Sequence, residues 1–593
     1  MSTDATDPYT LHDDPEEGGN EFHVFWADEV ADQIERRNPD EPIVIKGGIS
    51  PSGVPHLGNM NEIMRGYFVA EALRNRGYEV RQVFTSDDRD PLRGLPRKLA
   101  DLDGNVVGLG DVDAGALGKN LGKPYTDVPD PFGCCDSYGD HFSNFVQRAA
   151  DQLGVPIDVV SNTELYESGA FEDVTRRLLA NVGLARDVLS PYQDKVDEDY
   201  IPFNPICAEC GKITETVLSV DPEAETVEYE CTDIEAGEQT IDGCGHQGTA
   251  TFREGKLPWR FEWPAQWEIL GVDHEPFGKD HAEGSWPSGE DIAVNVLGNE
   301  PPVPMVYEWF TLNGEPFSSS AGNVILVGEV LELVEPEVLR YFFSKNPSKA
   351  RDFDVGGLDQ LTGECDRFER AFYGEPDAGS HDPELAARVY PDVIRPTVAA
   401  LAGEDGILRL DGKGPWSRAV SDSDERDRVD GIITTGFDRR ERLPYTFAAV
   451  LGMADDPAIR EQVAREEGHL EADAPEWAVG YALARVELAE EWARRVDNEY
   501  NYELKRAELP AVDLSPAEAA ALDDLAKFVA EGHDGEAIQG EIYEAARRHD
   551  VEVGDFFAVG YQLFFGQGEG PKLGPFLGKL DQEFVVTRLR REG

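Results

Sequence analysis

Cysteine, basic residues and long apolar runs are all scarce in this sequence. Seven of the 593 residues are cysteine, an odd number that argues against a secreted disulfide framework and favours a reducing cytoplasm. No apolar run is long enough to span a bilayer, so we expect no membrane partner. Residues 1–20 have neither an apolar core nor basic flanks. We therefore expect an acidic flexible tail there and no secretory signal.

The scarcity of basic residues gives the chain an extreme charge. It has 54 basic and 117 acidic residues, a net charge of −63. Such a surface repels itself and any polyanion at low salt. Because the acidic residues lie within segments of clear apolar periodicity, we expect a folded, salt-adapted (halophilic) protein and not a disordered one. An RNA partner then requires local basic spots and high ionic strength, where screening shortens to a few Å.

The first hundred residues follow the pattern of a βαβ unit. A short apolar run at 42–45 leads into a glycine-rich turn that ends at Asn59. A helical pattern covers 60–76 and ends at Gly77, and a second strand pattern covers 80–85. This order predicts a doubly wound, Rossmann-type parallel sheet, whose ligands bind at the carboxyl ends of the strands.

The turn after the first strand carries the most specific motif, the string PSGVPHLGN at residues 51–59. Glycines allow close backbone approach to phosphates, and the start of a helix favours anions. The imidazole of His56 can stabilise charge that develops on a phosphate. The string resembles the His-Ile-Gly-His signature of class I aminoacyl-tRNA synthetases, in a His-Leu-Gly-Asn form.

A second motif lies far downstream, at Pro316-Phe317-Ser318-Ser319-Ser320-Ala321-Gly322-Asn323. It resembles the Lys-Met-Ser-Lys-Ser loop of the same class, but Pro316 and Ala321 replace its lysines. Those ammonium groups stabilise charge on the pyrophosphate. We expect another cation, with Lys279 as the candidate, or Mg²⁺ to take a larger share.

Further strings narrow the resemblance. Three tryptophans stand at four-residue spacing from Trp259, and Gly278-Lys279-Asp280-His281 follows an expected strand end. With the strings at 25–28, 88–93, 130–133 and 570–574, these resemble the class I, archaeal-type lysyl-tRNA synthetases from about residue 21 to 576. The resemblance implies a class I catalytic domain over 21–350, with a zinc-bearing insertion at about 201–256. A helical, all-α anticodon-binding domain would cover 351–593.

The resemblance also implies the reaction and its residues. Lysine and ATP, with Mg²⁺, form lysyl-adenylate, and the lysyl group then passes to the lysine tRNA. Catalysis would use His56, Lys279, Ser318, Ser319 and Ser320. ATP binding would use Pro51, Ser52, Gly53, His56, Gly58, Asn59, Gly278, Ser318 and Ser319. The amino acid would contact Gly48, Ser50, Trp259 and His281, with Asp87, Asp88 and Asp280 as candidates for the carboxylate that takes its ammonium group.

Four cysteines fall in one short acidic segment: Cys207, Cys210, Cys231 and Cys244. Their Cys-x-x-Cys-Gly and Cys-Gly-x-x-Gly knuckles predict a structural Zn²⁺ with a closed shell. His246 is an alternative to Cys244 as the fourth ligand. The adjacent Cys134 and Cys135 look poorly placed to share a metal, but a second site near Asp136, Asp140 and His141 stays open.

Three alternatives remain at this stage. The chain could be another class I synthetase, of glutamyl or arginyl type, in which case an Arg should face a substrate carboxylate. It could be a nucleotidyltransferase-like core without an RNA partner. It could also be an RNA-binding paralogue without aminoacylation activity, because the loop lysines are missing. For the lysyl-tRNA synthetase we expect a monomer.

Overall fold

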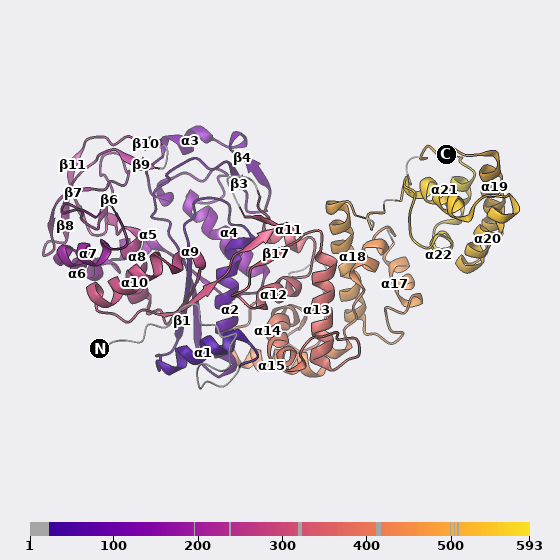
Figure 1. Cartoon of the computed structure of the whole chain (residues 1–593), viewed down its shortest axis with the longest axis horizontal. Helices are drawn as coiled ribbons and strands as arrows, with labels where there is room; N and C mark the ends of the chain where they lie inside the picture. Colours follow the sequence, from indigo (N-terminus) through magenta and orange to yellow (C-terminus); the bar gives the residue numbers. More distant parts are fainter. Residues whose placement is uncertain are drawn as a thin grey trace. The chain divides into compact units, whose positions relative to one another are not determined.

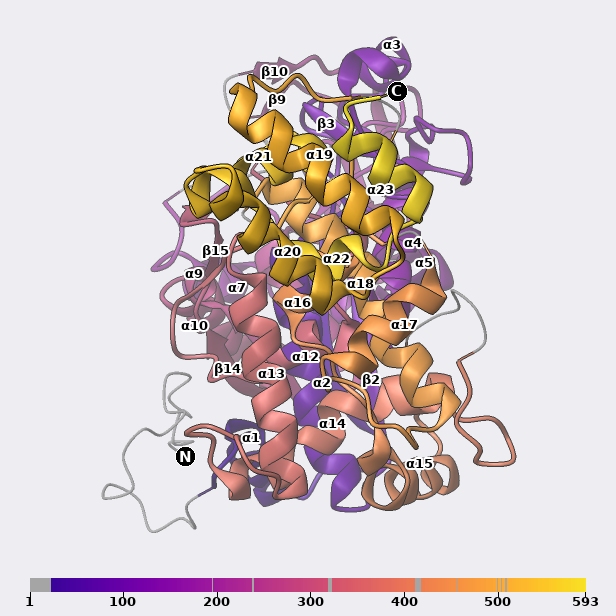
Figure 2. The ribbon, with the colours of Figure 1, turned by 90° about the vertical axis from the view of Figure 1, so that its right-hand side faces the viewer.

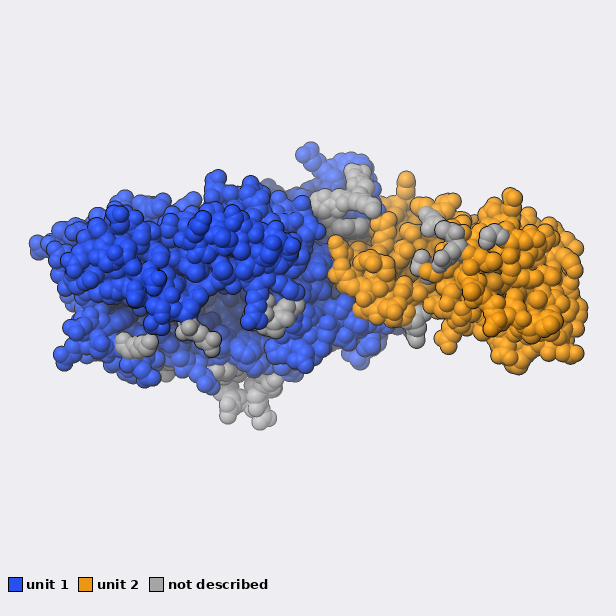
Figure 3. All heavy atoms as spheres, turned by 90° about the horizontal axis from the view of Figure 1, so that it is seen from above, with its two compact units in different colours: residues 1–331, 335–438 blue, residues 332–334, 439–593 orange. Residues whose placement is uncertain are grey.

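The computed structural model describes residues 23–194, 196–236, 239–317, 323–410, 417–454, 456–498, 500–502, 504–506 and 509–592. These residues form two compact units (Figure 3). Unit 1 takes the described residues up to 331 and 335–438, and unit 2 takes 332–334 and those from 439 onward. By their contacts the helices between 358 and 435 thus belong with unit 1. The functional division expected at residue 351 stays a prediction.

Unit 1 is built on a five-stranded parallel sheet in the order β14-β13-β1-β2-β5. Its central strand, β1, is labelled in Figure 1. Its strands are β1 (Ile43–Ile49), β2 (Val80–Ser86), β5 (Asp158–Ser161), β13 (His274–Gly278) and β14 (Val303–Tyr307). Strand β13 is buried along its whole length, as are the first residues of β1, which is typical of a parallel strand covered on both faces. The sheet confirms the expected Rossmann-type α/β fold.

Helix α2 (Met60–Asn75) connects β1 to β2 and packs against both strands. Nearly every residue from Met60 to Leu73 is buried, because α2 lies between the sheet and further helices of unit 1. A one-turn 3₁₀ helix, η1 (Leu57–Asn59), precedes it. Gly77 follows the helix at φ +94°, a left-handed conformation that glycine adopts without strain, as expected for a helix end.

The remaining elements of unit 1 surround the sheet. Residues 95–123 contain two short strands, a one-turn 3₁₀ helix (Leu109–Asp111) and a short α-helix, in which backbone pairing and an Asp113 cap satisfy polar groups. The other strands of unit 1 are β3 (Lys98–Ala100), β4 (Val106–Gly108), β6 (Asn204–Pro205), β7 (Thr216–Asp221), β8 (Thr226–Glu230), β9 (Ile234–Ala236), β10 (Gln239–Ile241), β11 (Gln247–Thr251), β12 (Gly255–Lys256), β15 (Phe310–Leu312), β16 (Glu315–Pro316) and β17 (Arg351–Phe353). Strands β6 to β12 form the expected insertion between the two halves of the sheet.

Its other α-helices are α1 (Trp26–Arg36), α3 (Ala114–Lys119), α4 (Tyr138–Gln152), α5 (Asn162–Ser168), α6 (Glu172–Ala180), α7 (Val182–Leu189), α8 (Trp259–Leu270), α9 (Lys279–Ala282), α10 (Ser285–Ile292), α11 (Val327–Leu331), α12 (Pro336–Ser344), α13 (Leu358–Tyr373), α14 (Pro383–Leu401) and α15 (Ser423–Thr435). Helices α13, α14 and α15 pack consecutively, α13 on α14 and α14 on α15. Helix α14 also contacts α12, so these helices extend the core of unit 1.

Every regular element among the described residues of unit 2 is a helix, which agrees with the all-α expectation (Figure 2). Its helices are α16 (Tyr445–Leu451), α17 (Pro457–Glu466), α18 (Glu476–Val496), α19 (Pro516–Ala530), α20 (Gly535–Arg548), α21 (Val553–Phe565), α22 (Leu573–Leu577) and α23 (Gln582–Leu589). Helices α19 to α23 enclose one apolar core. None of the helices described in either unit is long and apolar enough to cross a membrane.

Candidate active site

The carboxyl ends of four neighbouring strands meet at one edge of the sheet. In the pairing register Ile49 of β1 lies beside Ser86 of β2, and Gly278 of β13 lies beside Tyr307 of β14. The candidate motifs follow β1 and β13 directly, so the parallel topology brings their residues to this edge. This is where ligands bind in open α/β sheets.

His56 stands at the start of η1 and holds the turn that follows it. The Nδ1 of His56 accepts a hydrogen bond from the backbone N–H of Gly58 at 3.1 Å. The backbone N–H of His56 donates to Asn59 Oδ1 at 2.9 Å. The imidazole stacks on Phe317, with ring centroids 4.9 Å apart. Burial lowers the pKa of His56 to about 4, so the ring is neutral at physiological pH.

Position 58 has no room for a side chain beside the His56 ring. A Cβ at this position would lie 2.8 Å from the His56 ring and 3.4 Å from the Phe317 ring. Among the other predicted ATP contacts, Pro51 is buried and Ser52 is exposed. A Cβ at Gly53 would meet nothing within 4 Å, so that glycine leaves open space at the turn.

Phe317, of the motif at 316–323, contacts His56 of the motif at 51–59. Ser318, Ser319 and Ser320 lie outside the described residues. On the far side of them, Asn323 donates from Nδ2 to the carbonyl of Pro316 at 2.8 Å, so the described residues that flank 318–322 are in contact. Because Phe317 stacks on His56, the two signature motifs occupy one side of the site.

Glu62, which the sequence did not single out, lies at this edge of the sheet, between Gly48 of β1 and Tyr307 of β14. Its Oε1 accepts from the backbone N–H of Gly48 at 2.7 Å, and its Oε2 accepts from the Tyr307 hydroxyl at 3.3 Å. Burial, followed by the nearby charge of Glu275, raises the pKa of Glu62 to about 8. A carboxyl group with so perturbed a pKa at a strand-end edge is a functional-site candidate.

The glycine pair at the end of β1 makes room for this carboxyl group. A Cβ at Gly47 would stand 2.8 Å from Glu62 Oε1, and a Cβ at Gly48 would stand 2.3 Å from Thr85 Oγ1. Any side chain at either position would push against Glu62 or β2. Gly48, which the sequence predicts to contact the amino acid, therefore binds Glu62 through its backbone N–H.

The structure gathers two of the predicted amino-acid contacts around an aromatic group. Trp259 begins α8 and stacks on Trp263, with ring centroids 5.0 Å apart. The His281 ring lies 5.4 Å from Trp259 and 5.6 Å from Trp263. His281 Nε2 is 3.5 Å from Asp280 Oδ2, so the predicted Asp280 is part of the same group. Trp263 and Trp267 are buried, while Trp259 is half-buried and retains an accessible face.

Lys279, the expected substitute for the missing loop lysines, is held at the mouth of the site. Its Nζ forms an ion pair with Glu308 and lies 5.0 Å from the centroid of Trp309. Trp309 is 53% exposed, and its Nε1 donates to Asp280 Oδ1 at 3.3 Å. A Cβ at Gly278 would lie 2.6 Å from the same Asp280 oxygen, so a side chain there would displace the Asp280 carboxylate.

The predicted acids at the end of β2 are engaged elsewhere. Asp88 Oδ1 accepts from the backbone N–H of Thr163 at the start of α5, at 2.8 Å. Asp87 Oδ1 accepts from the side-chain amides of Asn162 and Gln266. Burial raises the pKa of Asp87 to about 8. Asp88 thus holds the start of α5, and Asp87 joins α5 to α8. The contact of Asp88 with the amino acid stays a prediction.

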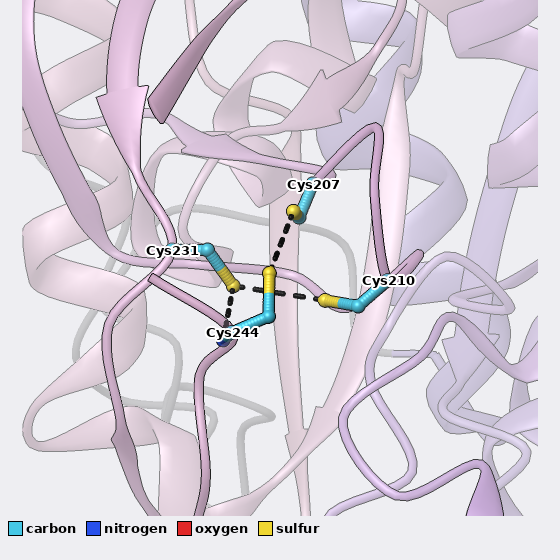
Figure 4. Close-up of side chains that lie close together, drawn as sticks. All are labelled: Cys207, Cys210, Cys231 and Cys244. Atoms are coloured by element: carbon cyan, nitrogen blue, oxygen red, sulfur yellow. Dashed lines mark hydrogen bonds between the residues drawn. The ribbon is translucent and has the colours of Figure 1, made fainter. Parts of the chain in front are cut away.

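The four cysteines of the insertion converge on one point (Figure 4). Their sulfur atoms lie within 4.8 Å of one another, with Cys207–Cys244 at 3.6 Å and Cys210–Cys231 at 3.7 Å. A tetrahedral Zn²⁺ with Zn–S bonds of about 2.3 Å requires S···S separations of about 3.8 Å. The donor set therefore fits zinc, and Cys244, not His246, completes it.

A second cluster corrects the sequence interpretation. Asp130, Cys134, Cys135 and His141 place their ligand atoms within 4.8 Å of one another, although the adjacent cysteines were expected not to share a metal. Asp130 Oδ2 accepts from both cysteine N–H groups, which turns both thiols to one side. Asp140 instead interacts with Ser137 at the start of α4, at 2.7 Å.

His141 in this cluster has the geometry of a metal-binding imidazole. Its Nε2 is 2.8 Å from the carbonyl of Ala100, and its Nδ1 lies 3.3 Å from both Cys134 Sγ and Asp130 Oδ1. A backbone carbonyl that fixes one nitrogen leaves the other to face an ion. The second donor set therefore also fits a metal ion.

Comparison with known proteins agrees with this geometry. Residues 24–391 match the profile of the family described as tRNA synthetases class I (K). The chain belongs to the class I lysyl-tRNA synthetases. Among curated members of this family, the lysine–tRNA ligase of Halobacterium salinarum is 65% identical over 98% of this chain and 99% of its own length. The lysine–tRNA ligase of Pyrococcus horikoshii is 31% identical over 96% of this chain and 100% of its own length.

Solved structures give a weaker likeness to this lysyl-tRNA synthetase. A glutamate–tRNA ligase from Elizabethkingia meningosepticum aligns at a TM-score of 0.38 and 11% identity, over 93% of this chain and 99% of that one. A likeness at this level carries no functional argument.

Proposed function

We propose that the protein is a lysine–tRNA ligase, which activates L-lysine with ATP and transfers the lysyl group to the lysine tRNA. The observation that carries the lysine specificity is Glu62, a carboxyl group of raised pKa between Gly48 and Tyr307. Glu62 is half-buried at the strand-end edge, where a carboxyl group is a natural partner for a substrate ammonium group. Family membership supports the reaction itself.

In this proposal the side chain of lysine would lie between Glu62 and the aromatic group. The ammonium end would pair with Glu62, and the Tyr307 hydroxyl fixes that carboxylate from the other side. The aliphatic stem would lie along the accessible face of Trp259, whose stacking on Trp263 keeps the ring in place. A substrate carboxylate in the same place would meet Glu62, which disfavours a glutamyl enzyme.

The phosphate end of ATP would lie at His56 and the start of α2. There the backbone N–H groups and the helix dipole favour anions. Because His56 is neutral, it acts as a hydrogen-bonding group toward the phosphates and not as a fixed charge. Lys279 and the hydroxyl groups of Ser318, Ser319 and Ser320 would share the remaining contacts. Mg²⁺ that arrives with ATP would supply the positive charge that the missing lysines do not.

The metal clusters have a structural role in this proposal. The thiolates of Cys207, Cys210, Cys231 and Cys244 would hold Zn²⁺ and fold the insertion around it, because a site with four protein ligands has no open position for catalysis. The second cluster, around His141, would stabilise the segment before α4 in the same way. Neither cluster supplies a group to the chemical step.

The remaining expectations complete the proposal. The helical domain expected over 351–593 would bind the anticodon, and the protein would act as a monomer in the cytoplasm, where translation takes place. The absence of both loop lysines gave some weight to a paralogue without activity. Lys279, held between Glu308 and Trp309 at the mouth of the site, weakens that alternative.

ATP–pyrophosphate exchange across the twenty amino acids, in concentrated KCl with and without tRNA, tests the specificity. We expect exchange with lysine alone. Exchange with glutamate or arginine and not lysine would overturn the specificity, and tRNA binding without any exchange would identify an inactive paralogue. Glu62→Gln serves as the matched variant, since it keeps the shape of the side chain and removes its charge.

A further inference from the structure

The second cluster, formed by Asp130, Cys134, Cys135 and His141, presents its thiols to solvent. Cys134 is exposed and Cys135 is half-buried, and their sulfur atoms lie 3.7 Å apart. Accessible thiolates react with dissolved oxidants, whereas buried thiols in an apolar environment are inert. Cys134 and Cys135 are therefore two accessible thiols in direct contact.

The four-cysteine cluster protects its thiols better. Cys207 and Cys231 are buried and Cys210 is half-buried, so Cys244 alone of these four is exposed. The sulfur atom that Cys244 contacts, at 3.6 Å, belongs to the buried Cys207. An oxidant should therefore react with the second cluster before it reacts with this one.

A bound ion in the second cluster would depend on both of its thiols. Zn²⁺ keeps its cysteine ligands as thiolates, the form that attacks oxidants. The other two ligands, Asp130 and His141, have fully buried side chains, with exposed fractions of 1% and 0%. Because zinc in proteins is usually four-coordinate, these two ligands are too few to hold it alone. A bond between the two sulfur atoms would therefore release the ion.

The loop that carries these thiols ends at a residue that contacts the proposed ATP site. The backbone N–H of Tyr138 donates to the Val128 carbonyl at 2.8 Å, which closes residues 129–137 into a loop. The Tyr138 hydroxyl, at the start of α4, donates to the carbonyl of Ser52 at 3.3 Å. The Tyr138 side chain is completely buried. A change in the shape of this loop would therefore act on the backbone of Ser52.

Apolar packing provides a second connection to the site. One core cluster contains Tyr138, Val54 of the His56 motif and Leu326, which follows the serine motif. The backbone N–H of Leu57 donates to the carbonyl of Ile325 at 2.9 Å, so the segments beside the two motifs are also joined to each other. The start of α4 thus packs against residues from both sides of the proposed phosphate site.

We propose that Cys134 and Cys135 are a site of reversible oxidation, at which hydrogen peroxide joins the two sulfur atoms, releases Zn²⁺ and weakens ATP binding. The proposal goes beyond the function proposed above, because neither the oxidation nor the release of the ion involves an amino acid or a tRNA.

The reaction has two steps. The exposed Cys134 thiolate attacks one oxygen of the peroxide, which breaks the O–O bond and gives a sulfenic acid and a hydroxide ion. The Cys135 thiolate then attacks the Cys134 sulfur, which forms the S–S bond and expels a second hydroxide ion. Two protons from solvent turn both hydroxide ions into water. The sulfur atoms lose the two electrons that the peroxide gains, and Zn²⁺ leaves with its charge unchanged.

The product should be easy to reduce. The Cα atoms of adjacent residues lie about 3.8 Å apart across a trans peptide bond, below the range of about 4.4–6.8 Å in which disulfides usually form. A disulfide outside this range is strained and is reduced more readily. A thiol reductant and added Zn²⁺ should therefore restore the original cluster.

Peroxide treatment of the full-length, zinc-loaded protein in concentrated KCl tests the site, with a chromogenic chelator to measure released zinc. One of two ions should be released, and mass spectrometry should find the peptide that contains Cys134 and Cys135 lighter by two hydrogen atoms. A thiol reductant with Zn²⁺ should reverse both changes. Cys210→Ser, which lacks the other ion, should release all of its zinc. Cys365→Ser, the matched control outside both clusters, should behave as the wild type.

The effect on the ATP site is measured by equilibrium dialysis with labelled ATP, before and after oxidation. The Kd for ATP should rise about three- to tenfold in the oxidised protein, the scale expected for loss of one hydrogen-bonded contact, while the Kd for lysine changes less. Tyr138→Phe removes only the hydroxyl group that binds Ser52. Its Kd for ATP should already be raised, and oxidation should raise it less than in the wild type.

Three results would each show the proposal to be wrong. The first is zinc that stays bound to Cys210→Ser in peroxide, and the second is released zinc without a disulfide between Cys134 and Cys135. The third is an unchanged Kd for ATP in the oxidised wild type. None of these measurements requires aminoacylation, so a failure of the proposed function would leave them intact.

Discussion

Lys46 and Glu275 form an ion pair inside the sheet, 2.7 Å apart and only 2% and 3% exposed. Lys46 belongs to β1 and Glu275 to β13, so the pair joins two central strands directly beneath the candidate site. Glu275 also accepts hydrogen bonds from the indole N–H groups of Trp263 and Trp267. Since Trp263 stacks on Trp259, the ion pair positions the aromatic wall of the lysine site.

Glu275→Gln is expected to damage both stability and lysine binding. It leaves the Lys46 ammonium group buried without a counter-charge, and the loss of one partner from a buried pair costs about 3–5 kcal/mol in the free energy of unfolding. Because the indole contacts weaken too, the KM for lysine should rise more than the KM for ATP. Denaturant unfolding and exchange kinetics measure the two effects. The double variant Lys46→Met/Glu275→Gln should recover part of the stability, and equal KM changes for both substrates would speak against a positioning role.

His56→Ala should lower the rate of pyrophosphate exchange by about 10²–10³-fold, the usual loss when one group that stabilises charge in the transition state is removed. Thermal unfolding should show a folded protein. Burial depresses the pKa of His56 to about 4, so the stability gained from its neutral form is complete above the unfolded value of 6.5 and is lost as the pH falls through about 4. Unchanged exchange in the variant would remove His56 from the phosphate site.

Lysine binding should release a proton. Burial raises the pKa of Glu62 to about 8, so the free enzyme holds this group mainly protonated at pH 7, while the substrate ammonium favours its ionised form. Titration calorimetry at pH 7 in buffers of different ionisation enthalpy should therefore report release of about one proton, and none above about pH 9. Glu62→Gln should abolish the release.

The raised pKa of Glu62 also affects the free energy of unfolding. Because the folded pKa of Glu62 lies above its unfolded value, the stability that it contributes is complete below the unfolded pKa and is lost as the pH rises through about 8. The free energy of unfolding of Glu62→Gln should depend less on pH than that of the wild type between pH 5 and 8. Equal pH dependence in both proteins would mean that the carboxyl group is ionised at neutral pH.

Metal analysis of the purified protein should find two zinc ions per chain. Cys210→Ser and Cys134→Ser should each lose one of them, because they belong to separate clusters. Cys365→Ser, which changes a buried cysteine outside both clusters, is the matched control and should keep both ions. A single ion that is lost only with Cys210→Ser would leave the cluster around His141 without a metal.

The signature motifs could be found from the sequence because their chemistry is local. His56 and Gly58 lie two residues apart, and the turn that they form is held by a hydrogen bond between them. Likewise the four insertion cysteines stand in knuckles whose spacing fixes where their thiols point. The doubly wound sheet followed from one βαβ pattern, because parallel strands require such crossovers.

Glu62 could not be found in this way. An acidic residue in the first turn of a helix usually faces solvent and interacts with the helix dipole. Only the folded sheet shows that two glycines and Tyr307 surround it. The contact of Asp88 with Thr163 could not be foreseen for the same reason, since it depends on α5, 75 residues away; its role toward the amino acid stays a prediction. Cys134 and Cys135 converge because their backbone N–H groups both donate to Asp130. The spacing of the cysteines alone does not predict this turn.

The most direct test of the central claim is the transfer of labelled lysine to an unmodified lysine tRNA by the purified protein, with ATP and Mg²⁺, in concentrated KCl. The account predicts acid-precipitable lysyl-tRNA at a rate that falls at least 100-fold in Glu62→Gln and in His56→Ala, the scale expected for loss of a charged or transition-state contact. Transfer of a different amino acid, or lysyl transfer that neither variant slows, would contradict it.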